Sequence, residues 1–167
     1  MKPQLTKNDV EKIEAEIRDR TLVQRPKLIQ ELKEARAQGD LSENFEYYAA
    51  KRAKGQNDSR IRYLENMIKN AIIIDDTSSE GEVSLNNTVT FKYVDDDEEE
   101  TVKIVTSIRG NTVSGKISNE SPIGKALLGH KVGDICEVAL PNGGSYEIRI
   151  TALDQSSNDE DDSIRTY

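Results

Sequence analysis

Apolar residues in the first part of the chain recur with the spacing of an α-helix. Before Gly39 they lie three, four and eleven residues apart, and the same period returns over residues 45–70. Thr6 and Asp9 form a capping-box-like pair at the start of the first segment. Pro26 predicts a kink or short break in the helix just before Pro26 itself. Each segment spans roughly 30 residues, or about 45 Å as a helix. The pattern therefore predicts two long helices.

The segment 39–44 separates the two helical patterns and predicts a tight turn. Gly39 is suited to end the first helix, and Ser42 or Asn44 can cap the second. Neither helix is apolar all round, so each needs a partner along one stripe, and the short turn makes the other helix that partner. We expect an antiparallel coiled-coil hairpin over residues 1–76, with residues 39–44, here called the tip, at its free end.

The pattern changes after Ala71 to short runs rich in Val, Ile and Thr. These runs predict β-strands over residues 88–94, 102–108, 132–138 and 146–153. A short helix should interrupt them, because Ser121 is a natural cap, Pro122 fits the first helical position and Gly129 ends the segment. The expected fold class is α+β, with a small β-rich domain over residues 80–154 after the hairpin.

Charge is distributed unevenly between the two halves. Residues 1–77 carry 15 Lys or Arg and 14 Asp or Glu, whereas the remainder carries 8 and 17, and the net charge is -8. This acidic balance disfavours tight stand-alone binding to nucleic acid. The acidic, Ser-rich residues 155–167 have little to bury and are expected to be disordered. The acidic run 95–100 is expected to be a solvated hairpin loop.

Cysteine content and hydropathy indicate in which cellular compartment the protein is expected. The single Cys136 excludes an internal disulfide and lies in an apparent strand, where we expect a packed thiol. No apolar run approaches membrane-spanning length and no signal peptide is visible. A cytoplasmic location is therefore expected.

The tip carries two carboxylates, Asp40 and Glu43, which can face outward together. Mg²⁺ prefers octahedral oxygen coordination, and these two side chains supply only part of such a shell. A partner would have to provide further carboxylates or phosphates, as two-metal phosphoryl chemistry requires. The same spacing also suits residues that only cap a helix and complement its dipole.

Basic residues follow the tip along the second helix. Lys51 lies about two turns from it and can contact a phosphate backbone, with Arg36, Arg52 and Lys54 nearby. Ordinary solvated helix charges explain the same residues. The only histidine, His130, adjoins the end of the predicted short helix, where a surface or capping role suits it better than catalysis.

Two stretches resemble the signatures of the bacterial Gre transcript cleavage factors. Residues 35–47 read ARAQGDLSENFEY and resemble the N-terminal signature, and residues 121–134 read SPIGKALLGHKVGD and resemble the C-terminal one. The likeness covers residues 5–153, and the acidic balance favours the GreA-like branch. It implies an N-terminal antiparallel coiled coil followed by a domain of FK506-binding-protein-like fold, a fold that does not itself imply prolyl isomerase activity.

The resemblance also implies a function. The chain would be a monomeric accessory factor and not an enzyme, docking through its β-rich domain at the rim of the secondary channel of bacterial RNA polymerase. The coiled coil would enter the channel, and the polymerase would then cleave the 3′ end of its own backtracked nascent RNA. No cofactor would be bound alone, because Mg²⁺ would be shared with the polymerase active site.

Roles for individual residues follow from the same resemblance. Asp40 and Glu43 would assist catalysis and bind the metal only within the polymerase complex. Lys51 and Arg52 would contact RNA. The residues implied for polymerase docking are Ser121, Pro122 and Lys125.

Three alternatives remain open at this point. One is a Gre-fold inhibitor that plugs the channel without supporting cleavage, which the intact pair Asp40 and Glu43 disfavours. The others are a stand-alone metal nuclease, which two carboxylates on a rod disfavour, and a coiled-coil adaptor with no chemical role. Phe45 stands where the family usually has Ala, so the packing at the tip is expected to differ.

Overall fold

The computed structural model describes residues 2–39, 44–77, 79–156 and 163–165. They form two compact units, one comprising Met1–Pro3 and Val10–Ala71 and the other Gln4–Asp9 and Ile72–Tyr167. The helical unit therefore ends at Ala71, whereas the sequence pattern placed its end at residue 76. Within the described ranges, no helix combines the length and apolar character that crossing a membrane requires.

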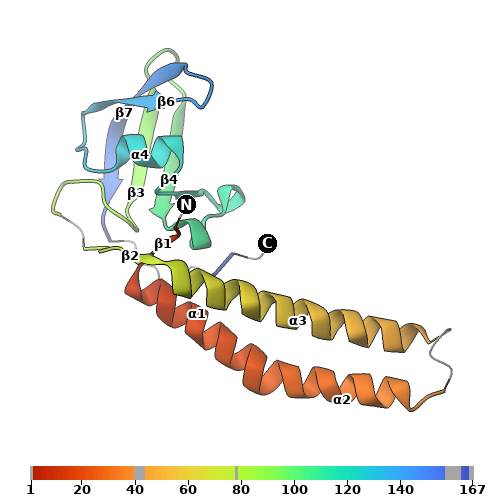
Figure 1. The fold of residues 1–167 in the computed structure, drawn as a ribbon. Helices are drawn as coiled ribbons and strands as arrows, with labels where there is room; N and C mark the ends of the chain where they lie inside the picture. The colour runs from red at the N-terminus through yellow and green to blue at the C-terminus, as the bar shows by residue number, and fades with distance from the viewer. Residues whose placement is uncertain (1, 40–43, 78, 157–162, 166–167) are drawn as a thin grey trace. The chain divides into compact units, whose positions relative to one another are not determined.

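The first unit is an antiparallel helical hairpin (Figure 1). One side consists of α1 (Lys7–Asp19), the π-helical turn η1 (Arg20–Gln24) and α2 (Arg25–Arg36), and the other is α3 (Phe45–Asn70). The pairing is antiparallel because Asn44, just before α3, bonds to Ala35 at the end of α2, whereas Arg60, further along α3, bonds to Glu16 in the earlier helix α1. The predicted hairpin is confirmed.

Pro26 produces a π-helical turn in the first side of the hairpin. The N–H of Arg25 donates to the carbonyl of Arg20, five residues earlier, so the helix is widened and does not break. Pro26 has no N–H and its ring crowds the preceding turn, and a wider turn relieves that crowding. The predicted irregularity is present, but it is an inserted residue within a continuous helix.

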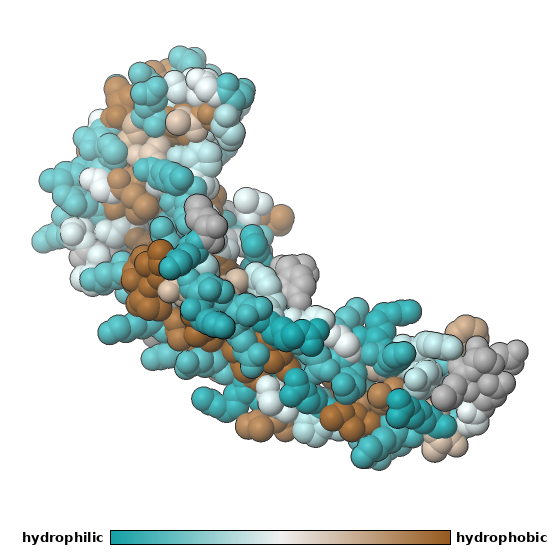
Figure 2. All heavy atoms as spheres, in the orientation of Figure 1, coloured by the Kyte–Doolittle hydropathy of each residue, from teal (hydrophilic) through white to brown (hydrophobic). Residues whose placement is uncertain are grey.

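Ile13, Ile61 and Leu64 are buried along the seam between the two sides of the hairpin. The view in Figure 2 shows apolar atoms on this unit as separated patches within a largely hydrophilic surface. Among the described residues of this unit, the buried apolar side chains are Ile13, Ala35, Ile61 and Leu64, so polar contacts between the helices contribute to their alignment.

A five-stranded mixed sheet forms the centre of the second unit, in the order β5-β4-β3-β7-β6. The strands are β3 (Thr88–Tyr93), β4 (Glu99–Val105), β5 (Lys116–Ser118), β6 (Ile135–Ala139) and β7 (Ser145–Asp154). β4 and β5 are parallel and the other pairs are antiparallel. The predicted β-rich domain is confirmed, although β5 was not predicted.

Strand β4 differs from its predicted span. It begins at Glu99, inside the acidic run, and ends at Val105. Thr106 then leads into the 3₁₀ turn η2 (Ser107–Arg109), and a second 3₁₀ turn, η3 (Thr112–Ser114), precedes β5. The antiparallel pairing of β4 with β3 continues as far as Glu99 and Glu100, which lie opposite Lys92 and Phe91.

Helix α4 (Pro122–Leu127) packs against β6 and contributes Leu127 to the core. A Cβ on Gly124 would clash with the carbonyl oxygen of Ser118, so this close approach requires glycine. Cys136 is buried as predicted, and burial raises the pKa of its thiol, with the charge of Asp134 adding to the effect.

Gln4 and Leu5 precede the capping box and are part of a separate two-stranded sheet. They form β1 (Gln4–Leu5), which pairs in parallel with β2 (Ile72–Ile73), and Leu5 is 1% exposed. The predicted capping box follows directly. The N–H of Thr6 donates to Asp9 Oδ2 at 3.0 Å, and the N–H of Asp9 donates to Thr6 Oγ1 at 3.1 Å.

A buried ion pair joins this N-terminal segment to the rest of the second unit. Arg109 Nε donates to Asp9 Oδ1 at 2.6 Å, and both side chains are 0% exposed. The hydroxyl of Thr106 donates to Asp9 Oδ2 at 2.7 Å, and Arg109 Nη1 donates to Asn86 Oδ1 at 2.9 Å. These bonds explain why residues 4–9 belong to the β-rich unit.

The described part of the C-terminal tail makes contacts that its composition did not predict. Gln155 Nε2 donates to the carbonyl oxygens of Ser79 at 2.7 Å and Glu82 at 2.9 Å. The N–H of Arg165 donates to the carbonyl of Ile108 at 2.6 Å. Gln155 and Arg165 therefore contact the β-rich unit although the tail was expected to be disordered, and residues 157–162 lie outside the described ranges.

Candidate functional site at the end of the helical hairpin

The predicted tip carboxylates, Asp40 and Glu43, lie outside the described residues, as does the candidate cap Ser42. Gly39 and Asn44, the first and last residues of the tip, are described, and they flank the segment 40–43. These flanking residues determine where the intervening segment begins and ends.

Asn44 joins the two helices at the base of the tip. Its Oδ1 accepts a hydrogen bond from the N–H of Tyr47 at 3.0 Å, which caps α3. Its Nδ2 donates to the carbonyl oxygen of Ala35, in the last turn of α2, at 2.7 Å. One side chain therefore satisfies an end of each helix, and of the two predicted caps Asn44 fills the role.

Gly39 reverses the chain after α2. Its φ is +116°, a conformation that side-chain-bearing residues rarely adopt. Before it, the N–H of Ala37 donates to the carbonyl of Lys33 at 3.1 Å and closes the helix. The predicted helix-ending glycine is confirmed.

The adjacent residues Tyr47 and Tyr48 differ in exposure at the start of α3. The guanidinium of Arg36 lies 5.7 Å from the ring centre of Tyr47, across the hairpin, and this cation–π contact supports a half-buried ring. Tyr48 is 46% exposed, and its ring meets that of Tyr47 edge-on at 5.3 Å and 65°. Tyr47 therefore packs between the helices while Tyr48 faces outward.

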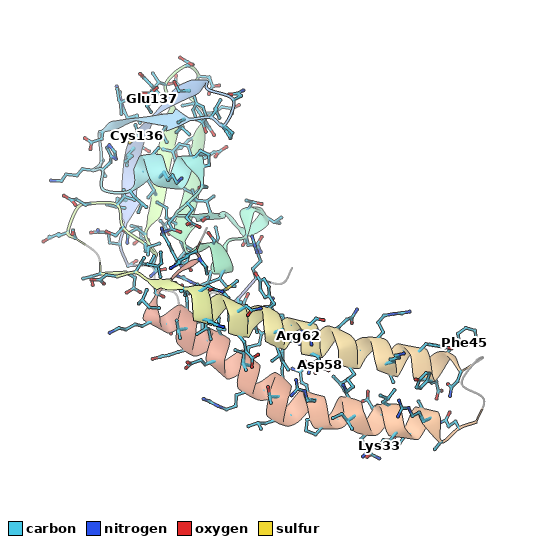
Figure 3. The ribbon with its side chains drawn as sticks, viewed as in Figure 1. Lys33, Phe45, Asp58, Arg62, Cys136 and Glu137 are labelled. Carbon is cyan, nitrogen blue, oxygen red and sulfur yellow. The ribbon has the colours of Figure 1, made fainter. Side chains whose placement is uncertain are left out.

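Phe45 is the first residue of α3, and its side chain is 86% exposed. Figure 3 shows it at the end of α3, pointing away from α2. The ring therefore remains accessible to solvent, which is an unusual environment for a side chain of this size.

The predicted RNA-contacting residues Lys51 and Arg52 are both exposed on α3. Lys54, by contrast, donates to Asp58 Oδ2 at 3.0 Å, and Arg25 donates to Asp58 Oδ1 at 3.0 Å from the facing helix. The hydrogen bond from Lys54 lowers the pKa of Asp58 against the opposing effect of burial, and Arg25 lowers it further. Arg25 therefore joins the two helices through Asp58, and Lys54 binds the same carboxylate from within α3.

A polar cluster in the middle of the hairpin was not predicted. Glu16 Oε1 accepts hydrogen bonds from Arg20 Nε at 2.8 Å and Arg60 Nε at 2.9 Å. Burial acts to raise the pKa of Glu16, but hydrogen bonds from Arg60 and then Arg20 outweigh it and lower the pKa overall. The sequence does contain a signal for this cluster. Asn57, Arg60 and the buried residue Leu64 are three and four residues apart, so they share one face of α3.

The three predicted docking residues lie at α4. Ser121 caps this helix, accepting from the N–H of Gly124 at 3.1 Å and donating to the carbonyl of Ser118 at 2.6 Å, so its hydroxyl serves the fold. Pro122 and Lys125 are exposed. They line a groove of about 340 Å³ together with Glu120, Ala126, Glu137, Ala139, Leu140 and Pro141.

Among the residues that the structure describes, no group of three or more His, Cys, Asp or Glu side chains is placed to hold a metal ion. This includes the described acidic residues of the β3–β4 hairpin. Asp40 and Glu43 are not among them, so the prediction of a shared metal is not tested by this observation.

Comparison with known proteins identifies the family. The model of the N-terminal region of GreA/GreB transcription elongation factors matches residues 3–73, and that of the C-terminal region matches residues 78–155. The chain therefore belongs to the GreA/GreB family of transcription elongation factors, as the two signature stretches predicted.

Individual relatives place the chain on the GreA-like side of this family. Transcription elongation factor GreA of Macrococcus caseolyticus is 46% identical over 149 residues, covering 89% of this chain and 94% of the relative. That of Staphylococcus saprophyticus is 44% identical with the same coverage. Among solved structures, GreA factor homolog 1 (Gfh1) of Thermus thermophilus is 29% identical over 92% of this chain and 99% of its own, with a TM-score of 0.44.

Proposed function

We propose that this chain is an accessory factor of bacterial RNA polymerase that stimulates cleavage of backtracked nascent RNA. The observation that carries the proposal is the bond from Asn44 to Ala35, which joins the two helices on either side of a tip containing Asp40 and Glu43. A rigid hairpin closed in this way can deliver two carboxylates to the active centre of a partner. The protein acts as a monomer in the cytoplasm.

The chemistry of the tip side chains fits Mg²⁺. Carboxylate oxygens are the ligands this ion prefers, and it is commonly held by one or two carboxylates together with phosphates. When bound, a second Mg²⁺ supplies activation of water and charge stabilisation at the leaving oxygen. Asp40 and Glu43 complete a shell whose other ligands come from the polymerase, and the chain alone holds no cofactor.

Exposed positive charge on α3 supports an RNA contact. Lys51 and Arg52 are exposed, and cationic side chains bind the phosphate backbone without regard to sequence. In this proposal they hold the extruded 3′ segment of the RNA beside the hairpin.

The groove at α4 is the proposed docking surface for the rim of the secondary channel. Lys125 is exposed at this groove, beside Glu120 and Glu137, so a partner of mixed charge and some apolar surface fits it. Lys125→Glu is expected to weaken polymerase binding by about thirtyfold or more, the effect of losing a charge pair that becomes desolvated in the complex. Arg149→Glu, which reverses the charge of an exposed residue on β7, is the matched control. Equal effects of the two variants on polymerase binding would show that the groove at α4 is not the docking surface.

A reconstituted transcription complex tests the proposed activity. Purified polymerase is halted and backtracked on RNA labelled at its 5′ end, and the RNA is followed with the factor alone, the polymerase alone and both together. Rapid shortening of the RNA only with both proteins supports the proposal. Shortening of free RNA by the factor alone indicates a nuclease, slowed elongation without cleavage indicates an inhibitor, and no change indicates an adaptor.

A further inference from the structure

An aromatic and basic stripe runs along the outer face of α3 from its first residue. Phe45, Tyr48 and Arg52 are spaced i, i+3 and i+7, which places them on one face of a helix. Phe45 is 86% exposed and Tyr48 46% exposed, and Arg52 is exposed as well. The stripe lies opposite the face that carries the buried residues Asn57 and Leu64.

Neighbouring residues hold Phe45 and Tyr48, the two aromatic residues of this stripe, in place. The bonds of Asn44 fix the first turn of α3, so the backbone of Phe45 is anchored while its ring is free. Tyr48 rests edge-on against Tyr47, which in turn lies under the guanidinium of Arg36. Two accessible rings on a fixed backbone lose little conformational entropy when they bind a flat ligand.

We propose that Phe45 and Tyr48 form a stacking surface for unpaired bases at the extruded 3′ end of the RNA. The inference rests on the proposed function, because Phe45 follows the tip residue Glu43 by two positions and would reach the same RNA end. Aromatic side chains stack on bases of any sequence, with an effect of about 5- to 150-fold per base in binding. Arg52, one turn beyond Tyr48, contacts the phosphate that follows the stacked bases.

The combination of side chains favours RNA as the occupant. A protein contact with an apolar wall would be served by any large apolar residue, whereas this stripe joins two aromatic rings to a cation. Aromatic rings followed by a basic residue are the typical contact of proteins with single-stranded nucleic acid, where bases stack and phosphates are neutralised. The stripe therefore predicts that the size and presence of the RNA base affect the reaction.

The test measures single-turnover cleavage of backtracked complexes at limiting factor, with RNA ending in a purine, a pyrimidine or an abasic nucleotide. Phe45→Ala is expected to lower the rate about tenfold for the purine, less for the pyrimidine and not at all for the abasic end. Phe45→Trp should retain the full rate. An equal loss with all three ends would overturn the proposal.

Two control variants separate stacking from other contacts. Phe45→Leu keeps an apolar side chain without a π-face, so it should behave like Phe45→Ala, and wild-type activity in this variant would show an apolar contact instead. Val113→Ala removes an exposed apolar residue of the second unit, 97% exposed, and should change nothing. A competition binding assay with polymerase should give equal affinity for every Phe45 variant.

A direct readout of stacking uses 2-aminopurine as the 3′ base, because its fluorescence is quenched when it stacks. Wild-type factor should quench it in the backtracked complex, Phe45→Ala should quench it much less, and Tyr48→Ala should have an intermediate effect. Asp40→Asn separates the two proposals: it should lower cleavage about a hundredfold or more at every end and leave quenching intact. If Asp40→Asn lowers cleavage but Phe45→Ala leaves the quenching unchanged, only the stacking inference is overturned.

Discussion

Asn57 bonds to both the backbone and the side chain of Arg20 across the helical hairpin. Its Nδ2 donates to the carbonyl oxygen of Arg20 at 3.1 Å, and its Oδ1 accepts from Arg20 Nη1 at 3.1 Å. The same carbonyl accepts the π-helical bond from Arg25. A buried asparagine in a helical seam fixes the register of the helices, since a shift would leave its polar atoms without partners. Register in turn determines how the two ends of the tip meet.

Asn57→Ala removes both of these bonds from a side chain that is 4% exposed. We expect the free energy of unfolding of the hairpin to fall by about 1–3 kcal/mol, the usual cost of disrupting buried hydrogen bonds. The measurement is urea unfolding followed by the helical circular dichroism signal. Gln56→Ala, at an exposed position next to it, should change stability by less than about 0.5 kcal/mol. Equal effects of the two would show that Asn57 does not fix the register.

Glu16 predicts an acid dependence of the same unit. Its pKa is lowered in the folded chain from an ordinary value of 4.5, so the folded state binds its proton less readily than the unfolded state. The stabilisation is therefore fully present above the ordinary pKa and is lost as pH falls through the folded one. Glu16→Gln should destabilise the hairpin more at pH 7 than at acidic pH.

The measurement compares helical unfolding of wild type and Glu16→Gln across this pH range. Glu14→Gln, at an exposed position two residues earlier, is the control and should change stability by less than about 0.5 kcal/mol at neutral pH. A difference for Glu16→Gln that stays constant from neutral to acidic pH would contradict the assigned role of Arg60 and Arg20.

The pair Arg109 and Asp9 is a third target, in the second unit. Arg109→Met leaves the carboxylate of Asp9 buried without its cation, and breaking such a pair costs about 3–5 kcal/mol. Hydrogen exchange of the β3 and β7 amides should accelerate accordingly, since global opening exposes them. Arg149→Met replaces an exposed arginine of β7 and should leave exchange nearly unchanged. Unaltered exchange in Arg109→Met would show that the pair is not needed for the fold.

Local signals in the sequence predicted the helical hairpin, the caps and most strands. Thr6 with Asp9, Ser121 with Pro122, and Gly39 each act within a few residues, so their outcome depends on backbone chemistry that is visible locally. The resemblance to the Gre signatures added the order of the units. Both kinds of evidence led to the same α+β fold.

Contacts between distant residues were not predicted. β1 forms only because Gln4 and Leu5 meet Ile72 and Ile73 far along the chain, and β5 is only three residues long. Similarly, Asp9 looked like a simple cap, yet it is also the partner of Arg109, 100 residues later. Pairings of this kind are set by the packed fold and leave no periodic signal.

For the candidate site, sequence identified the residues of the tip and structure described what surrounds them. The cap at Asn44 followed from local chemistry, whereas its bond to Ala35 required the hairpin to be closed. The exposure of Phe45 also needed the structure, because its departure from the usual Ala suggested only different packing at the tip.

The roles proposed for Asp40 and Glu43 form the centre of the account. Asp40→Asn and Glu43→Gln keep the shape and most hydrogen-bonding capacity of the side chains but remove their charge. If the residues only cap a helix, cleavage should be unaffected. If they help hold a second Mg²⁺ in the polymerase, each change removes charge where water is activated, and added Mg²⁺ should restore part of the lost rate.

The most direct measurement is the single-turnover cleavage rate of a backtracked complex, titrated with Mg²⁺, for wild type and the variants Asp40→Asn and Glu43→Gln. The account predicts a rate lower by about a hundredfold or more for each variant, partial recovery at high Mg²⁺, and polymerase affinity within about threefold of wild type. Cleavage by both variants at the wild-type rate would contradict it and leave the tip as a structural turn.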